Sequence, residues 1–414
     1  MEDATKFTLA ADLETFPEEI LDLAETLEVL DLSGNRLKRL PRRFSELREL
    51  RIAFFSGNDF ETFPEVLGEC PNLEMVGFKS NRIARVAGDA LPSRLRWLIL
   101  TDNRLESLPE ELGRRPRLQK LMLAGNRLRQ LPDSLAACEN LELLRISANR
   151  LECLPAWLWT LPRLSWLAAS GNPCCHFPSS MDAPRIPWAD LVLGDLLGEG
   201  ASGRILKTFW ADREVALKIF KGRVTSDGLP QDERAACLAA GIHENIIPVH
   251  GALDGHPEGK DGLVLGLVDP RFKNLGDPPT MESCTRDVFA PKAQFSPIQA
   301  LRIARGIALA MDQLHRNGIV HGDLYAHNIL VDGTGSALLG DFGAASSLKE
   351  LSPFEADAFR RIDCRAFGCL MDDLLSLVQD TAIFPDLLVH LRNRCMTPVP
   401  SQRPLFEEIL RGLE

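Results

Sequence analysis

Apolar residues in the first half of the chain recur in one pattern every 22 or 23 residues. The pattern is LxxLxLxxNxLxxLPxxLxxL, and residues 118–138, LQKLMLAGNRLRQLPDSLAAC, match it almost completely. Its asparagines stand at Asn35, Asn58, Asn81, Asn103, Asn126, Asn149 and Asn172. Seven copies at so regular a spacing predict a stack of turns, because a single turn cannot bury its own apolar side chains.

Each turn is expected to supply one short strand, with its leucines in a shared core. The asparagine amide is expected to bond backbone groups where the chain bends away. The pattern resembles the leucine-rich-repeat family, whose fold is a solenoid. Residues 1–26 are predicted to cap the array, and residues 27–180 to form the repeats. No residues in this half form a catalytic site, so the expected role of the repeats is to contact a partner or another part of the chain.

A different pattern begins after Pro184 and Pro187, which indicate a linker at residues 181–190. The run LVLGDLLGEGASGRIL places three glycines in a GxGxxG spacing between two strand-like segments. Glycines in such a loop let backbone amides approach phosphate groups, although a glycine-rich hairpin has the same appearance. The loop alone is therefore weak support for a nucleotide site.

Three further motifs follow in order along the second half. EVALKIF carries Lys218, HGDLYAHNIL carries Asp323 and Asn328, and LLGDFGAA carries Asp341. Together with the glycine loop, this order and spacing resembles the protein-kinase family across residues 188–414. The resemblance assigns residues 191–414 to a kinase-like domain. The expected fold of the chain is a leucine-rich-repeat solenoid followed by a bilobal protein-kinase fold.

The resemblance also implies a role for each motif residue. Lys218, anchored by Glu233, would hold the α- and β-phosphates of ATP. Asp341 and Asn328 would bind Mg²⁺, with Mn²⁺ as a possible substitute. Asp323 would orient the acceptor hydroxyl group and take its proton. The residues expected to contact ATP are Gly198, Glu199, Gly200, Ala201, Ser202, Gly203, Ile205, Ala216, Lys218 and Glu233.

The second half departs from the usual kinase sequence at Gly322, where many kinases have an arginine that binds a phosphorylated activation loop. Only 19 residues separate Gly343 from Asp363, and no APE triplet lies between them. A shortened platform for peptide substrates is therefore expected. His321 and Asp363 are interpreted as structural residues.

An active protein kinase is the favoured function, with serine or threonine favoured over tyrosine as the acceptor. A pseudokinase scaffold is an alternative, because the short activation segment could prevent substrate docking. A small-molecule phosphotransferase is another, since HGDxxxxN also occurs in aminoglycoside- and choline-kinase-like enzymes. The complete glycine loop, the VALKIF strand and the DFG motif argue against this last alternative.

Composition and charge limit the partners and the cellular compartment that are expected for this chain. The formal net charge of −11 argues against a nucleic-acid partner, because such a partner requires a basic face. The sequence contains no run of about 18 apolar residues, so no membrane span is expected. The ten cysteines lack paired spacing and suit reduced thiols, which predicts a cytoplasmic protein.

One face of the repeat array is expected to carry its contacts. Positions six and four before each asparagine are predicted to point to the concave, solvent-facing side. They are Val29, Ile52, Met75, Trp97, Lys120, Leu143 and Trp166, followed by Asp31, Phe54, Gly77, Ile99, Met122, Arg145 and Ala168. This apolar surface is expected to bind a protein substrate or regulator, or to be covered by another part of the chain.

Overall fold

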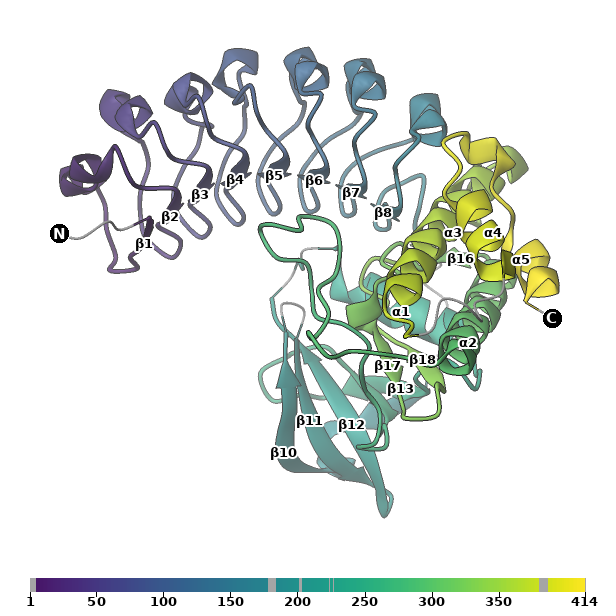
Figure 1. Cartoon of the computed structure of the whole chain (residues 1–414). Helices are drawn as coiled ribbons and strands as arrows, with labels where there is room; N and C mark the ends of the chain where they lie inside the picture. Colours follow the sequence, from purple (N-terminus) through teal and green to yellow (C-terminus); the bar gives the residue numbers. More distant parts are fainter. Residues whose placement is uncertain are drawn as a thin grey trace. The chain divides into compact units, whose positions relative to one another are not determined.

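The computed structural model describes residues 5–177, 184–200, 203–222, 224–225, 227–379 and 386–413 (Figure 1). The chain divides into two compact units, Met1–Leu164 and Ser165–Glu414. The last repeat turn is therefore grouped with the second unit, and each unit is described separately below.

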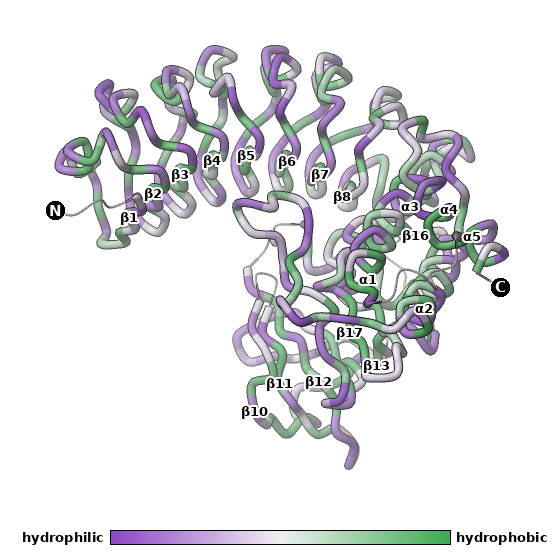
Figure 2. Tube along the Cα trace, viewed as in Figure 1, coloured by the Kyte–Doolittle hydropathy of each residue, from purple (hydrophilic) through white to green (hydrophobic). Residues whose placement is uncertain are grey.

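The first unit consists of short parallel strands, and a 3-10 helical turn follows each of them (Figure 1). The strands are β1 (Lys6–Thr8), β2 (Val29–Asp31), β3 (Ile52–Phe54), β4 (Met75–Gly77), β5 (Trp97–Ile99), β6 (Lys120–Met122) and β7 (Leu143–Arg145). The helical turns are η1 (Glu18–Leu23), η2 (Arg42–Glu46), η3 (Glu65–Glu69), η4 (Gly88–Ala90), η5 (Glu110–Arg114), η6 (Asp133–Ala137) and η7 (Ala156–Thr160). Figure 2 shows hydrophobic and hydrophilic stretches within each turn of the array.

The repeat asparagines tie successive turns together, as the sequence predicts. Asn126 is buried, and its amide nitrogen donates to the carbonyl oxygens of Leu100, at 2.8 Å, and Leu123, at 2.9 Å. Its amide oxygen accepts from the backbone nitrogen of Leu105 at 3.0 Å. One side chain thus satisfies three buried backbone groups that no regular strand pairing reaches.

The proline of the repeat pattern starts each helical turn from an extended backbone. Pro132 precedes η6 with φ −65° and ψ 138°, and the equivalent prolines precede η2, η3, η5 and η7. Ala87 takes this position in the third repeat, and the helical turn η4 that follows it has only three residues.

The concave face is less exposed than the sequence predicts. Met75 is 2% exposed and Leu143 is 3% exposed, so the expectation that these positions face solvent is wrong. Neighbouring strands pair in register, which places Ile52, Met75 and Trp97 side by side, and large side chains in one column cover each other. Lys120 lies over the Trp97 ring at 4.2 Å and covers it further.

The second unit begins with the last repeat strand and continues into a mixed sheet. Its strands are β8 (Trp166–Ala168), β9 (Arg185–Pro187), β10 (Leu191–Glu199), β11 (Gly203–Trp210), β12 (Arg213–Phe220), β13 (Val249–Asp254), β14 (Gly262–Gly266), β15 (Lys273–Asn274), β16 (Ile319–Val320), β17 (Ile329–Val331), β18 (Ala337–Leu339) and β19 (Ser346–Ser347). The larger sheet has the order β10-β11-β12-β14-β13-β9. Side chains on strands of this sheet form its buried apolar core, namely Ile186, Val215, Leu217, Leu253 and Val264.

Helices form most of the rest of this unit. They are α1 (Pro230–Ala240), α2 (Pro297–Arg316), α3 (Pro353–Ser376), α4 (Asp386–Cys395) and α5 (Phe406–Gly412), with short turns η8 (Trp188–Asp190), η9 (Ala326–Asn328) and η11 (Pro400–Gln402). Ser296 and Ser352 cap α2 and α3 in reciprocal capping boxes, and a proline follows each serine. Within the described ranges, no helix is both long and apolar enough to span a bilayer.

Candidate active site

Lys218 is the charged centre of the candidate site. It lies on β12, where the surrounding apolar residues bury it between β11 and β14. Its ammonium group donates a hydrogen bond to Glu233 of α1 and lies 3.7 Å from Asp341 Oδ1. A buried lysine requires such partners, because an isolated charge in an apolar interior is strongly disfavoured. The structure therefore brings together three residues that the sequence assigns to the site.

The three groups shift the pKa values of one another. Burial raises the pKa of Glu233 to about 7, although Lys218 opposes the shift. Burial also acts to lower the pKa of Lys218, but Asp341 and Glu233 together raise it above its ordinary value. Loss of hydration acts to raise the pKa of Asp341, although its side chain is 45% exposed, and Lys218 holds this pKa below the ordinary value. At neutral pH the lysine and Asp341 are therefore charged, while Glu233 titrates.

Asp341 has an unusual backbone. Its φ is 52°, in the left-handed region that non-glycine residues seldom adopt, and its Oδ1 accepts from Gly343 N at 3.2 Å. This conformation turns the chain at the DFG motif. Backbone strain of this kind persists where the surrounding structure imposes it, which is common at functional sites.

The glycine loop joins β10 to β11. Gly200 N donates to Gly203 O at 2.9 Å, which closes the turn, and Ala201 and Ser202 lie outside the described residues. A Cβ on Gly203 would lie 2.6 Å from the Ile219 carbonyl oxygen, so packing alone requires this glycine. A Cβ on Gly198 or Gly200 would meet nothing within 4 Å. The protein itself therefore does not require these two glycines, as expected where a ligand approaches the backbone.

The remaining positions assigned to nucleotide lie on the same sheet. Glu199 ends β10, Ile205 pairs with Lys218 between β11 and β12, and Ala216 is buried opposite Leu265. Short side chains such as Ala216 leave room over a sheet where a flat base could lie.

Asp323 and Asn328 lie together in the catalytic loop between β16 and β17. The Asn328 amide nitrogen donates to the Asp323 backbone oxygen at 2.9 Å and to its Oδ2 at 2.8 Å. The Asp323 backbone nitrogen donates to His321 Nδ1 at 3.2 Å. The carboxylate of Asp323 is thus held by its neighbours and remains partly exposed.

Buried residues beneath the loop fix its backbone. Asp363 of α3 accepts hydrogen bonds from the backbone nitrogens of His321, at 2.8 Å, and Gly322, at 3.0 Å. His321 Nε2 lies 3.1 Å from the Gly340 oxygen, and its ring contacts Phe342 at 5.2 Å. The structure therefore places both residues where the sequence interpretation expects them, as supports of the loop and of the DFG turn.

The activation segment is short. Only residues 344–352 lie between Gly343 and the start of α3 at Pro353, and β19 occupies part of this stretch. Glu350, within this segment, is exposed. Arg403, which directly follows η11, is fully buried and donates to the backbone oxygens of Thr397 and Arg361. The chain thus passes almost directly from the DFG motif into the helix that carries Asp363.

Family models match both halves of the chain. The protein kinase domain model matches residues 191–360. Leucine-rich-repeat models match residues 26–47, 93–151 and 116–173. The chain carries leucine-rich repeats followed by a protein kinase domain.

Curated relatives of this chain include several protein kinases. Fibroblast growth factor receptor 1 of Pleurodeles waltl is 26% identical over 318 residues, which cover 61% of this chain and 38% of the receptor. The dual specificity protein kinase pyk3 of Dictyostelium discoideum is 24% identical, covering 56% of this chain and 19% of its own length. The probable serine/threonine-protein kinase PknB of Lactococcus lactis is 28% identical, covering 38% of this chain and 24% of its own length. The chain thus spans less than two fifths of the length of these relatives.

The last repeat strand contacts the kinase domain directly. Trp166, expected on the solvent-facing side, is 1% exposed, and that expectation is wrong. Its indole nitrogen donates to the Leu324 carbonyl oxygen at 3.0 Å, and its ring stacks on Tyr325 at 4.2 Å with an interplanar angle of 10°. The catalytic loop therefore covers this tryptophan.

His327 and Asp287 form a pair beside the catalytic loop that the sequence reasoning missed. His327 Nδ1 lies 2.8 Å from Asp287 Oδ1, and its ring stacks on Tyr325 at 5.0 Å. Burial acts to lower the pKa of His327, but Asp287 raises it above its ordinary value. Asp287 lies in an irregular stretch between β15 and α2, where no motif or period marks it.

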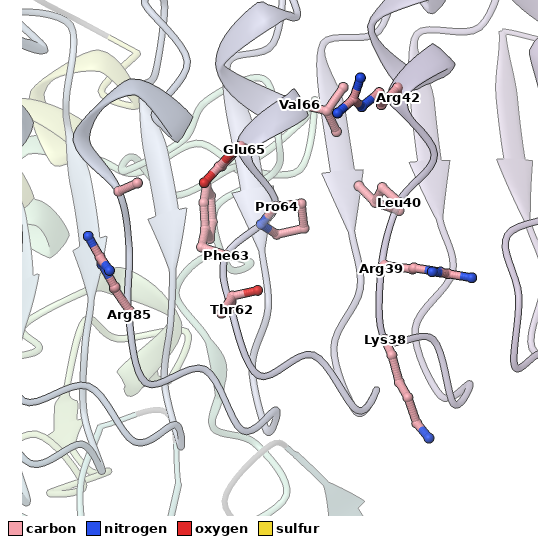
Figure 3. Close-up of a pocket in the computed structure, with 11 residues that line it drawn as sticks. Lys38, Arg39, Leu40, Arg42, Thr62, Phe63, Pro64, Glu65, Val66 and Arg85 are labelled. Carbon is pink, nitrogen blue, oxygen red and sulfur yellow. The ribbon is translucent and has the colours of Figure 1, made fainter.

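A separate hollow of about 390 Å³ lies among the repeats (Figure 3). Lys38, Arg39, Arg42 and Arg85 line it together with Glu65. None of these residues is assigned to phosphoryl transfer, so this hollow is not the active site of the kinase domain.

Proposed function

We propose that this kinase transfers the γ-phosphoryl group of ATP to hydroxyl groups of a protein, with serine or threonine preferred over tyrosine. The observation that carries the proposal is the contact of Lys218 with both Glu233 and Asp341. Kinases use this arrangement to hold nucleotide phosphates. Relatives named as serine/threonine kinases support the acceptor preference.

The residues present suit a magnesium ion. Magnesium in kinases is typically held by one or two protein oxygens together with substrate phosphates. The carboxylate of Asp341 and the amide oxygen of Asn328 would supply those ligands, because the Asn328 amide nitrogen is already used by Asp323. The described residues contain no cluster of three acidic, histidine or cysteine side chains that could hold a metal by themselves. When bound, the ion would neutralise phosphate charge, and Mn²⁺ could replace it.

Asp323 is proposed as the residue that orients the acceptor hydroxyl group and takes its proton. Its carboxylate is partly exposed, and Asn328 holds one of its oxygens. The backbone of the loop is fixed by Asp363, so the carboxylate has a defined position. A fixed base of this kind suits a reaction whose main demand is positioning.

The repeats are proposed to bring a protein substrate or regulator to the kinase domain. Partly exposed apolar side chains remain on the concave face at Phe54, Trp97 and Ile99, and such residues are typical of protein contacts. A cytoplasmic location belongs to the same proposal. The ten cysteines lack the paired spacing of a disulfide framework, as suits a reducing compartment.

Labelled ATP tests the proposal. The purified full chain is incubated with γ-labelled ATP and Mg²⁺, with and without general protein substrates. Label should enter protein, and Asp341→Asn should slow the transfer by about a hundredfold or more, since it removes one charge near the phosphates. Asp254→Asn, which alters an exposed carboxylate paired with Arg185, is the matched control and should transfer normally.

The other outcomes identify the alternatives. ATP binding without transfer would identify a pseudokinase scaffold. Transfer to an aminoglycoside or to choline, without transfer to protein, would identify a small-molecule phosphotransferase.

A further inference from the structure

The segment that carries the last repeat asparagine lies against the catalytic machinery. This terminal repeat turn, residues 165–177, belongs to the same compact unit as the kinase domain. The repeat model extends to residue 173, whereas the kinase model begins at residue 191. By sequence the turn is a repeat, yet it also makes contacts within the kinase domain's compact unit.

The first set of contacts reaches the catalytic loop. Trp166 donates its indole hydrogen to the Leu324 carbonyl oxygen and stacks on Tyr325, as described above. Leu324 and Tyr325 directly follow Asp323, so Trp166 holds the two residues after the proposed base. The stack continues from Tyr325 to His327, the residue before Asn328.

The second set of contacts reaches the activation segment. The Ala169 backbone nitrogen donates to Ser346 Oγ at 3.0 Å, and Cys175 Sγ lies 3.1 Å from the Ser347 carbonyl oxygen. Both serines are buried. The third serine of the segment, Ser352, caps α3. The serines that phosphorylation might have used therefore already have structural partners.

The close approach of the turn also accounts for Gly322. This glycine has φ +71°, and a Cβ there would lie 2.5 Å from the Leu167 carbonyl oxygen and 2.7 Å from that of Ala344. Backbone from the repeat turn and from the activation segment thus meets at the position where many kinases carry an arginine. No side chain fits there while the turn is docked.

We propose that the terminal repeat turn is a built-in positioning element of the kinase domain. Trp166 fixes the loop that carries Asp323 and Asn328, while Ala169 and Cys175 fix the activation segment. The turn takes the place of an arginine bound to a phosphorylated segment, so activity does not depend on phosphorylation there. This inference rests on the proposed phosphoryl transfer, and Trp166 acts through the loop rather than on substrate.

The test compares Trp166→Phe with the wild-type full chain. Phenylalanine keeps a ring against Tyr325 but removes the hydrogen bond to Leu324. Turnover is divided by the number of ATP sites titrated calorimetrically, so that misfolded protein does not count. We expect turnover per site to fall about tenfold with the KM for ATP unchanged, because the loop loses its position while Lys218 and Glu233 keep theirs. Trp166→Leu, which also loses the stack, should fall further.

The matched control is Trp157→Phe. Trp157 is a buried tryptophan of η7 in the first unit, and its indole nitrogen has no hydrogen-bond partner within the part of the chain that the structure describes. This variant should keep wild-type turnover per site. Phosphatase treatment of the wild type should likewise leave its turnover unchanged.

Two results would overturn the inference while leaving the proposed function intact. One is an active wild type whose turnover per site is unchanged by Trp166→Phe. The other is a large loss of wild-type activity after phosphatase treatment. A wild type that binds ATP but transfers nothing would instead overturn both proposals.

Discussion

Lys218 faces two carboxylates whose pKa values are shifted in opposite directions. Asp341 has a lowered pKa, whereas burial raises the pKa of Glu233 to about 7. The motif EVALKIF identifies the lysine from sequence, and its partner on α1 follows from the kinase resemblance. The pKa of Glu233 could not be predicted from sequence, because it depends on how completely α1 and β12 exclude water.

This pKa predicts a pH dependence of nucleotide use. Ionised Glu233 anchors Lys218, so kcat/KM for ATP should rise with pH through about 7. Stability should change in the opposite sense, because the folded state binds this proton more tightly than the unfolded chain, so stability is lost as pH rises from 4.5 to about 7. The measurement is kcat/KM between pH 6 and 8. In Glu233→Gln, kcat/KM for ATP should be low at every pH and should not rise near pH 7. A rise that persists in this variant would assign the titration to another group, such as His327.

The repeat turn is an element whose local form could be predicted closely. The 23-residue period locates each strand, and the proline of the pattern starts each helical turn except η4, which follows Ala87. The exposure of each strand position could not be predicted. The period indicates which face a side chain takes, but what covers that face depends on neighbours in register and on distant segments.

The asparagine of each turn should carry a measurable share of repeat stability. Asn126→Ala would leave the Leu105 nitrogen without its partner and would take one of two asparagine donors from each of the Leu100 and Leu123 carbonyl oxygens. Because unsatisfied buried groups are costly, we expect the free energy of unfolding to fall by about 2 to 4 kcal/mol. Denaturant unfolding measures this loss. Asn140→Ala, at a partly exposed asparagine with one hydrogen bond, is the control, and an equal effect in both variants would refute the asparagine's bridging role.

At the scale of the whole molecule, the order of motifs predicts the two kinds of fold but not their points of contact. Trp166 and Leu324 lie 158 residues apart, and no period or motif links them. Asp287 meets His327, which lies 40 residues further along the chain, in the same way. Residues that act within one motif were thus found from sequence, whereas residues that act by tertiary contact required the structure.

The most direct test of the whole account is the effect of Asp323→Ala on transfer and on binding, measured in the same preparation. Transfer of the γ-phosphoryl group should fall by at least about a hundredfold, because the acceptor hydroxyl group loses the residue that orients it and takes its proton. ATP affinity and thermal unfolding should barely change, since Lys218, Glu233 and Asp341 remain in place. Near-normal turnover in Asp323→Ala would contradict the account, because phosphoryl transfer would then not depend on this loop.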